Sequence, residues 1–246
     1  MNILTIDIGN TSSKIAVWDD NGLIYHDKSP VIAFQQIEEI VRKYEVTGAE
    51  VCSVRNESGE LFSKLRELLD ERASFMIPSD SLGFNIVSDY QGNLGVDRFA
   101  AYLGAVSKYP GESLIIVDAG TALTIDAVNI EGKFCGGNIS LGLYSRLRAL
   151  NEYTACLPLV SPIGDVRSFG INTESAIRSG AVTGVAAEIL FAFRRAQMTY
   201  NSSRILMTGG DAPLVFPWLD KEKVIWEYEP HLVGRGLNYY FRHYIY

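Results

Sequence analysis

Two short segments of the 246-residue chain place an aspartate, a glycine and small or polar residues directly after an apolar run. Residues 7–14 read DIGNTSSK, and residues 118–122 read DAGTA. A carboxylate at a strand end can hold a hydrated Mg²⁺, a glycine lets the backbone approach a phosphate, and the following N–H and hydroxyl groups can donate to phosphate oxygens. Either segment alone is also compatible with an ordinary hairpin turn. Because the pattern occurs twice, phosphate binding is favoured.

The first segment supplies a continuous set of candidate phosphate ligands. They are Asp7, Ile8, Gly9, Asn10, Thr11, Ser12, Ser13 and Lys14. Lys14 adds a positive charge to the set. The sequence contains neither G-x-x-x-x-G-K-[ST] nor G-x-G-x-x-G, so a P-loop and a dinucleotide-binding oxidoreductase are both disfavoured.

A third candidate is the sequence Gly95-Val96-Asp97-Arg98 at the start of an expected helix. Asp97 could accept a hydroxyl proton, and Arg98 could bind an anionic group of a substrate. The alternative is structural, since an acidic residue in the first helical turn complements the helix dipole and Arg98 could be a surface charge. Spacing alone leaves both interpretations open.

Two further positions are ambiguous. Thr208-Gly209-Gly210 follows an apolar strand, where glycines would let a nucleotide approach the backbone, but a plain strand-to-helix turn explains them equally well. Thr173 stands near the start of a long helical pattern, where a helix cap is more common than a ligand contact.

Alternating apolar patterns divide the chain into short strands and amphipathic helices. Strands are expected at residues 2–7, 13–18, 23–25, 50–54, 113–117, 121–128, 133–139, 205–207 and 224–226, and helices at 34–44, 60–69, 95–109, 141–150, 172–198 and after Pro230. The helix at 95–109 should bury a stripe of Val96, Phe99, Ala100, Leu103 and Val106 and leave Asp97 off it. In the helix at 172–198, a row of Gly180, Gly184 and Ala187 would admit another backbone.

The repeated strand–turn–strand unit predicts two related α/β halves that face each other across a cleft. The boundary is expected near Pro110-Gly111. It gives an N-terminal half of residues 1–111, with the first phosphate motif and the G-x-D-R sequence, and a C-terminal half of residues 112–246, with the second motif.

Composition narrows the class of protein. The formal net charge of −7 provides no general field to attract nucleic acid or an anionic membrane, so neither is expected as a partner. No continuous apolar run reaches the length of a membrane span, and the first ten residues lack the basic region of a signal peptide. Three scattered cysteines predict neither a disulfide framework nor a zinc site. These features predict a cytoplasmic protein.

In order along the chain, the motifs resemble those of the type III pantothenate kinases, a family within the superfamily of actin, sugar kinases and heat-shock ATPases. The matching segments are residues 7–14 (D-x-G-N-T-x-x-K), 95–98 (G-x-D-R), 117–122 (VDAGTA), 136–139 (GGNI), 154–158 (TACLP), 173–180 (TESAIRSG) and 208–210 (TGG). The resemblance implies two actin-like (ribonuclease H-like) halves around a nucleotide cleft, and a kinase that transfers the γ-phosphoryl group of ATP to the primary hydroxyl of pantothenate, the first step of coenzyme A biosynthesis.

The same resemblance implies roles for individual residues. Asp97 would be the catalytic base, and pantothenate would be held by Tyr90, Gly95, Val96, Asp97, Arg98 and Thr173. ATP would be bound by residues 7–14 and Thr121, with Mg²⁺ near Asp7. Asp118 would ligate a monovalent cation, K⁺ or NH₄⁺. A homodimer is expected.

The chain departs from the family pattern at two places. Leu141-Gly142 stands where the family has Pro-Gly, so a looser loop is expected there. The family's substrate-contacting tyrosine lies seven residues before the glycine of G-x-D-R, a position occupied here by Ser88, and Tyr90 reaches that contact only if two residues have been deleted.

Three alternatives stay open at this point. A kinase or phosphatase of the same superfamily could act on another small alcohol. A non-enzymatic nucleotide-binding regulator would be expected to lose Asp97 or one phosphate turn, and this chain has kept them all. A filament-forming actin-like ATPase would need more subdomains than 246 residues allow.

Overall fold

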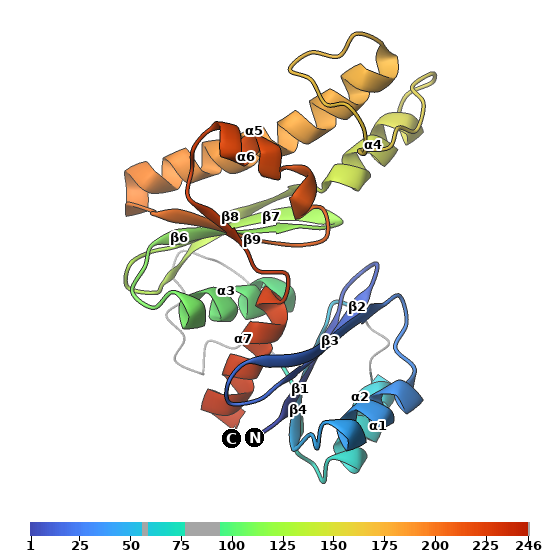
Figure 1. Cartoon of the computed structure of the whole chain (residues 1–246), viewed down its shortest axis with the longest axis vertical. Helices are drawn as coiled ribbons and strands as arrows, with labels where there is room; N and C mark the ends of the chain where they lie inside the picture. Colours follow the sequence, from blue (N-terminus) through green and yellow to red (C-terminus); the bar gives the residue numbers. More distant parts are fainter. Residues whose placement is uncertain (56–58, 77–93, 246) are drawn as a thin grey trace. The chain divides into compact units, whose positions relative to one another are not determined.

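The computed structural model describes residues 1–55, 59–76 and 94–245, which form two compact α/β units (Figure 1). Of these residues, the first unit holds 1–76, 94–110 and 231–245, and the second holds 111–230. The chain leaves the first unit between Pro110 and Gly111 and returns to it at His231. The C-terminal segment therefore belongs to the first unit, whereas the predicted boundary assigned all of residues 112–246 to the second half.

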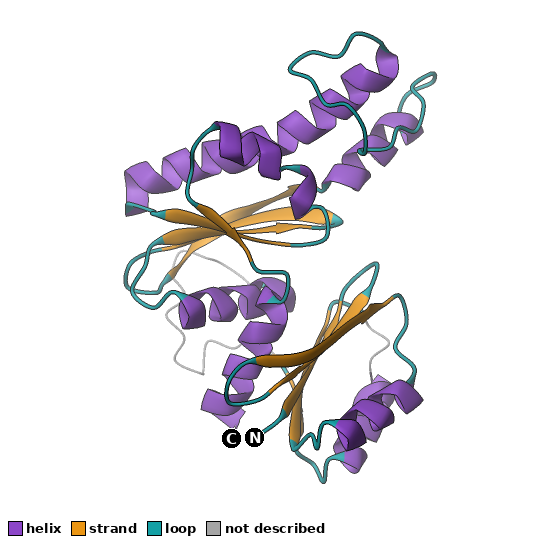
Figure 2. Cartoon of the chain, viewed as in Figure 1, coloured by secondary structure: helices purple, strands orange, loops and turns teal. Residues whose placement is uncertain are grey.

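A five-stranded sheet with the order β3-β2-β1-β4-β5 forms the centre of the first unit. Its strands are β1 (Ile3–Ile8), β2 (Ser13–Trp18), β3 (Leu23–Ser29), β4 (Gly48–Ser53) and β5 (Ala73–Phe75). β2 runs antiparallel to both of its neighbours, β1 and β3. β4 and β5 run parallel to β1. One face packs on α1 (Phe34–Lys43) and α2 (Gly59–Leu68), and the other on α3 (Val96–Lys108) and α7 (Leu232–Tyr240), which continues into the π-helical turn η3 (Phe241–Ile245) (Figure 2).

The second unit has a five-stranded sheet with the order β10-β9-β6-β7-β8. Its strands are β6 (Leu114–Ala119), β7 (Ala122–Val128), β8 (Phe134–Leu141), β9 (Arg204–Thr208) and β10 (Trp226–Tyr228). The long helix α5 (Thr173–Tyr200) packs across one face together with η2 (Ala212–Leu214) and α6 (Phe216–Lys221). α4 (Leu143–Glu152) lies beside the N-terminal half of α5, and both extend beyond the sheet (Figure 1).

The two sheets repeat one topology, which confirms the predicted duplication. β6 to β10 correspond in order and direction to β1 to β5. Asp7 and Asp118 are each the second-last residue of the equivalent strands β1 and β6. On the neighbouring parallel strand, Asp7 is paired with Cys52 and Asp118 with Thr208, so Cys52 and Thr208 are equivalent positions.

Helix α3 is buried on more sides than its sequence predicts. The residues from Arg98 to Ala105 are all buried, which is more than one stripe. The cause is α7, which packs on α3 at backbone distance: a Cβ on Gly236 would lie 1.8 Å from the carbonyl oxygen of Ala100, and one on Gly104 would lie 2.3 Å from that of Leu232. The periodicity of α3 alone could not reveal a partner more than 120 residues away in sequence.

Within the described residues of this chain, no other backbone approaches the small residues of α5. No described heavy atom outside the helix's own backbone lies within 4 Å of a Cβ built on Gly180, and one on Gly184 meets a side-chain nitrogen of Arg146 at 3.5 Å. That this row admits another backbone stays a prediction. α5 is long and apolar enough to span a membrane by length and composition alone, but 44% of its most apolar window is buried in the unit. Its buried side chains pack against β6, β7 and β9, as expected of a core helix in a globular unit.

Glu50 on β4 is a fully buried carboxyl group that no proposed catalytic role accounts for. Its side chain accepts a hydrogen bond from Ser74, and its Oε1 has no partner among the described residues. Burial raises the pKa of Glu50 from 4.5 to about 8, with the Ser74 hydrogen bond opposing the shift. The folded protein therefore holds this carboxyl protonated at neutral pH, while the unfolded chain ionises it.

We expect Glu50 to make the protein less stable as the pH rises from about 5 to 8. In this window the unfolded state has released the proton that the folded state retains, so the free energy of unfolding falls by roughly 2–3 kcal/mol between pH 6 and pH 8. Glu50→Gln should remove this slope and stabilise the protein at pH 8.5. The exposed Glu39→Gln is the matched control, because it makes the same substitution at a carboxylate that is not buried. Urea unfolding at several pH values measures the slope; parallel curves for parent and Glu50→Gln would contradict the prediction.

Candidate active site

The first aspartate–glycine segment forms the turn between β1 and β2. The N–H of Gly9 donates to the carbonyl oxygen of Ser12 at 3.1 Å. A Cβ at Gly9 would lie 3.0 Å from that oxygen, so the absence of a side chain permits the tight turn. Asn10 and Thr11 are exposed at its tip, where their polar groups are accessible to a phosphate.

Asp7 lies among charged and polar groups of the first unit. It is paired across the sheet with Lys14, and its Oδ1 accepts a hydrogen bond from the thiol of Cys52 at 3.6 Å. Burial raises the pKa of Asp7, and the charge of Asp97 raises it further, whereas Lys14 and the Cys52 hydrogen bond lower it. The structure thus brings together Asp7, Lys14 and Asp97, three of the predicted site residues, and adds Cys52.

Asp97 stands in the first turn of α3, and its carboxylate position depends on Gly95. Asp97 Oδ1 accepts a hydrogen bond from the N–H of Arg98 at 2.8 Å. A Cβ on Gly95 would lie only 2.8 Å from the same oxygen, although the backbone of Gly95 would tolerate a side chain, since its φ is −55°. The glycine of the G-x-D-R sequence therefore leaves the space that this carboxylate occupies.

We expect Gly95→Ala to reduce turnover by roughly tenfold while the fold is retained. The new methyl group must displace the Asp97 carboxylate, and misplacing a catalytic group by about 1 Å can cost up to 10²-fold. Gly59→Ala, at the start of α2, is the matched control, because no atom of the described residues lies within 4 Å of a Cβ built there. Steady-state kinetics and thermal unfolding of both variants test the idea. Unchanged turnover in a folded Gly95→Ala protein would contradict the carboxylate's role.

The remaining predicted substrate residues lie in different environments. The Arg98 side chain is buried, with only 6% exposed, so it is not a surface charge. Val96 is half-buried and Thr173 is exposed. Thr173 does not cap α5, because the side chain of Asn172 accepts the N–H of Ser175 in a reciprocal capping box. Tyr90 and Ser88 lie outside the described residues.

In the second unit, Asp118 is close to a tightly packed backbone turn after β9. Gly209 has φ +93°, and a Cβ there would lie 2.3 Å from the carbonyl oxygen of Ala119 and 2.5 Å from Asp118 Oδ1. Only glycine fits both this backbone conformation and this contact. The Tyr228 hydroxyl donates to the Gly209 carbonyl at 3.2 Å. Burial, followed by the charge of Asp118, raises the pKa of Tyr228.

A buried hydroxyl beside Asp118 fits a cation. Thr208 is 1% exposed, and its Oγ1 has no hydrogen-bond partner among the described residues. Its register partner is Asp118, so both side chains are directed to the same face of the sheet. A carboxylate and a hydroxyl oxygen are suitable ligands for K⁺, which prefers oxygen donors.

Thr121, the predicted ATP contact of the second turn, is hydrogen-bonded through its backbone to the start of α4. Its carbonyl oxygen accepts the Gly142 N–H at 3.0 Å and the Ser145 hydroxyl at 2.7 Å. A Cβ on Gly142 would lie 1.8 Å from the carbonyl oxygen of Gly120, so this approach requires glycine. Arg146 also donates to the Leu141 carbonyl at 2.7 Å. These bonds hold the segment where Leu141 replaces the family's proline, and the expected difference in looseness from the family stays a prediction.

Three residues near the two turns carry no motif signal in the sequence: Cys52, Arg55 and Tyr228. Thr208 belongs to the expected glycine turn, but its place beside Asp118 was not expected. Arg55 follows β4, and its guanidinium donates to the Asn10 carbonyl at the tip of the first turn, at 2.9 Å. Since the carboxyl ends of parallel strands share one edge, residues 52–55 and 208 could have been flagged once β4 and β9 were placed beside β1 and β6.

The first turn also fits Mg²⁺. Asp7 and Asp97 interact closely enough that one charge raises the pKa of the other, and a divalent cation would relieve this repulsion. Within residues 1–55, 59–76 and 94–245, no group of three or more His, Cys, Asp or Glu side chains could enclose a metal ion. In phosphoryl-transfer sites, Mg²⁺ is usually held by one or two carboxylates, and water and phosphate oxygens complete its coordination shell.

Comparison with solved structures identifies the fold. The chain aligns over its full length with a candidate N-acetylmannosamine kinase from Listeria monocytogenes, which is also fully covered, at a TM-score of 0.60 and 14% identity. It also aligns over 98% of its length with the activator of 2-hydroxyisocaproyl-CoA dehydratase from Clostridium difficile, solved with bound ADPNP, at a TM-score of 0.53 and 11% identity over 95% of that chain. The fold is thus that of actin-like sugar kinases and ATPases, as predicted.

Sequence comparison is more specific. The chain is 35% identical to a type III pantothenate kinase of Azobacteroides pseudotrichonymphae, covering 96% of this chain and 94% of the relative. It is 33% identical to one from Bacteroides fragilis, covering 97% and 96%, and 34% identical to one from Porphyromonas gingivalis, covering 96% of each. The sequence model of the type III pantothenate kinase family matches residues 3–195. Because both the family model and these near full-length relatives match, the chain belongs to the type III pantothenate kinase family.

Proposed function

We propose that Asp97 is the general base with which this chain phosphorylates pantothenate. The overall reaction, ATP-dependent phosphorylation of pantothenate in coenzyme A biosynthesis, follows from membership of the family. The observation that supports the base assignment is the Asp97 carboxylate itself, which lies in the space left by Gly95 and close enough to Asp7 to raise its pKa. A base at this place would be near the first phosphate turn.

The proposed chemistry is direct transfer. Asp97 accepts the proton of the primary hydroxyl as the alcohol oxygen bonds to the γ-phosphorus of ATP, and the bond to the β-γ bridging oxygen breaks to release ADP. Positioning and charge neutralisation contribute most of the rate in such reactions. We assign ATP binding to residues 7–14 and Thr121, with the Lys14 ammonium and the exposed turn around Asn10 directed to phosphate oxygens.

Pantothenate recognition is proposed for Gly95, Val96, Arg98 and Thr173, with Tyr90 as a further contact. A guanidinium can bond both oxygens of the pantothenate carboxylate. Burial of Arg98 supports such a role, because a guanidinium held away from water interacts more strongly with an anion. Capping by Asn172 leaves the Thr173 hydroxyl unnecessary for starting α5, which supports a ligand role for it.

We propose that two cations take part. Asp7 would hold Mg²⁺, which neutralises charge on the phosphate oxygens when it is bound. Asp118 would hold K⁺ or NH₄⁺, with Thr208 Oγ1 as a second oxygen. The orphaned hydroxyl of Thr208 supports this assignment, since a buried hydroxyl without a partner destabilises the protein unless a ligand satisfies it.

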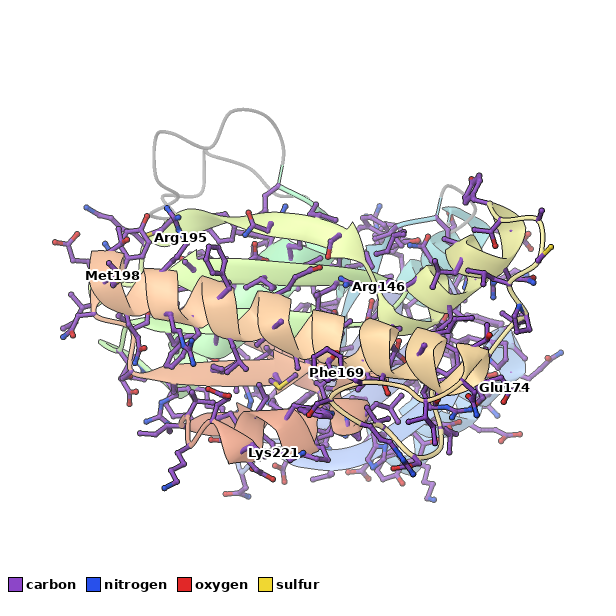
Figure 3. All side chains as sticks on the ribbon, turned by 90° about the horizontal axis from the view of Figure 1, so that it is seen from above. Arg146, Phe169, Glu174, Arg195, Met198 and Lys221 are labelled. Carbon is purple, nitrogen blue, oxygen red and sulfur yellow. The ribbon has the colours of Figure 1, made fainter. Side chains whose placement is uncertain are left out.

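A cytoplasmic homodimer completes the proposal. Apolar side chains are unusually exposed along α5 and the loop before it, with Phe169 88% and Met198 89% exposed (Figure 3). Exposed apolar groups in this number are typical of a surface that another chain covers, and a second copy is the partner expected for this family. Sedimentation equilibrium would measure the oligomeric state. No nucleic acid or membrane partner is proposed for this acidic chain.

The deciding experiment measures ADP release from ATP with pantothenate as acceptor, in the presence and absence of K⁺. Sugars of the kind used by actin-like kinases, and other small primary alcohols, serve as competing acceptors. Turnover with pantothenate, and with none of the other acceptors, supports the proposal. A folded protein that binds ATP and turns over none of these acceptors would instead support a nucleotide-binding regulator, and preference for another alcohol would identify a different kinase.

A further inference from the structure

We infer that Cys52 is a positioning residue for Asp7: its thiol hydrogen bond fixes the orientation of the carboxylate that faces the phosphates. The inference rests on the proposed function, because it gives Asp7 a role in holding magnesium-bound ATP. Nothing in the sequence motifs draws attention to Cys52, which lies outside all of them. The structure assigns the role through strand register, burial and one hydrogen bond.

Strand register places the thiol beside the carboxylate. β1 and β4 are parallel neighbours, and Asp7 is paired directly with Cys52. Side chains paired in this way project from the same face of a sheet. Ala49 and Val51, which flank Glu50 on β4, pack in the opposite core with α1 and α2. Cys52 and Asp7 therefore project to the face that carries α3 and Asp97.

The thiol acts as a neutral donor at this position. Its Sγ lies 3.6 Å from Asp7 Oδ1, and the residue is 1% exposed, so water does not compete for the bond. A thiol carries one hydrogen that it can donate, and it bears no charge when it does so. An ammonium or guanidinium in its place would neutralise the carboxylate and compete with a metal ion, whereas a thiol orients Asp7 without cancelling its charge.

The duplicated fold offers an internal comparison. The residue equivalent to Cys52 in the second unit is Thr208, which is paired with Asp118 in the same register. Both positions carry a small, neutral, buried side chain with one hydrogen-bond donor beside the motif aspartate. Thr208 Oγ1 makes no hydrogen bond among the described residues, so the bond from this position to the motif aspartate is found in the first unit only.

The test compares Cys52→Ala and Cys52→Val, which remove the donor, with Cys52→Ser, which restores a donor of similar size. The readouts are the Mg²⁺ concentration for half-maximal rate, kcat, and calorimetric affinity for ADP in the presence of Mg²⁺, which does not depend on turnover. For the two non-donor variants we expect the Mg²⁺ requirement and the ADP dissociation constant to rise roughly three- to tenfold, as for loss of one ordinary hydrogen bond, because a thiol is a weak donor. Cys52→Ser should stay within about twofold of the parent.

Control variants separate this inference from the function it rests on. Cys156→Ala, at an exposed cysteine, should behave as the parent in every readout. Parent-like Mg²⁺ and ADP values in folded Cys52→Ala or Cys52→Val would overturn the inference, as would an equal loss in Cys52→Ser, which would indicate packing alone. If Asp7→Asn also leaves the Mg²⁺ requirement and ADP affinity unchanged, the proposed role of Asp7 is wrong, and the inference fails with it for that reason.

Discussion

Asp97→Asn is expected to reduce turnover by at least about 10²-fold and to leave the fold intact. General-base catalysis typically contributes 10²–10⁴-fold, and asparagine retains the shape of aspartate while it removes the basic oxygen. The amide oxygen can still accept the N–H of Arg98, so the start of α3 should be preserved. Steady-state kinetics and thermal unfolding of the parent and the variant measure the two effects separately.

The structural alternative for Asp97 has its own control. An acidic residue in a first helical turn also interacts with the helix dipole, worth about 0.3–1 kcal/mol. Glu60→Gln, in the first turn of α2, removes such an interaction away from the proposed site and should lower stability slightly with unchanged turnover. If Asp97→Asn behaves like Glu60→Gln, with turnover within about threefold of the parent, Asp97 is a helix residue and the base must be sought elsewhere.

Asp118→Asn is expected to abolish most of the response of the enzyme to added potassium at saturating Mg²⁺. The change removes the charge that would hold the monovalent ion, while the second oxygen, Thr208 Oγ1, is too weak a ligand alone. Activity is measured over a potassium titration, with choline chloride keeping the ionic strength constant. If Asp118 served only to stabilise its turn, the variant would be less stable and equally responsive to potassium.

The duplicated turn provides the matched variant for this experiment. Asp7→Asn changes the equivalent residue of β1, and we expect it to raise the Mg²⁺ requirement without a selective loss of the potassium response. Two variants with identical cation profiles would refute the assignment of different ions to the two turns. A parent enzyme that is indifferent to potassium, sodium and ammonium would remove the monovalent site altogether.

The sequence alone determined most elements and the duplication. Apolar runs and alternation predicted the strands at 13–18 and 121–128 and the helix at 34–44 to within about a residue of β2, β7 and α1, because one buried face imposes its period on the sequence. Two copies of an aspartate–glycine turn predicted two equivalent sheets. The periodicity of an element and the residues of a tight turn are each contained in a few consecutive positions, so both can be recognised without knowledge of long-range contacts.

Tertiary structure decided which distant segments complete each half. β5 is only three residues long, and its pairing with β4, not its own pattern, makes it a strand. The C-terminal helix α7 joins the first unit because glycines at 104 and 236 allow its backbone to pack against α3, and this contact buries the side of α3 that the sequence assigned to solvent.

The same distinction holds at the candidate site. The motif aspartates and glycines could be identified by type and spacing. Cys52 could not, since it belongs to no motif, and Thr208 was noted only as part of a glycine turn. Each acquires its aspartate neighbour only when β4 and β9 lie beside β1 and β6. The sequence did not explain why a glycine stands at position 95. The structure explains it, because a side chain there would occupy the space of the Asp97 carboxylate. Sequence specified the reactive groups, and strand register and backbone packing specified their neighbours, because those neighbours lie 45 to 90 residues away along the chain.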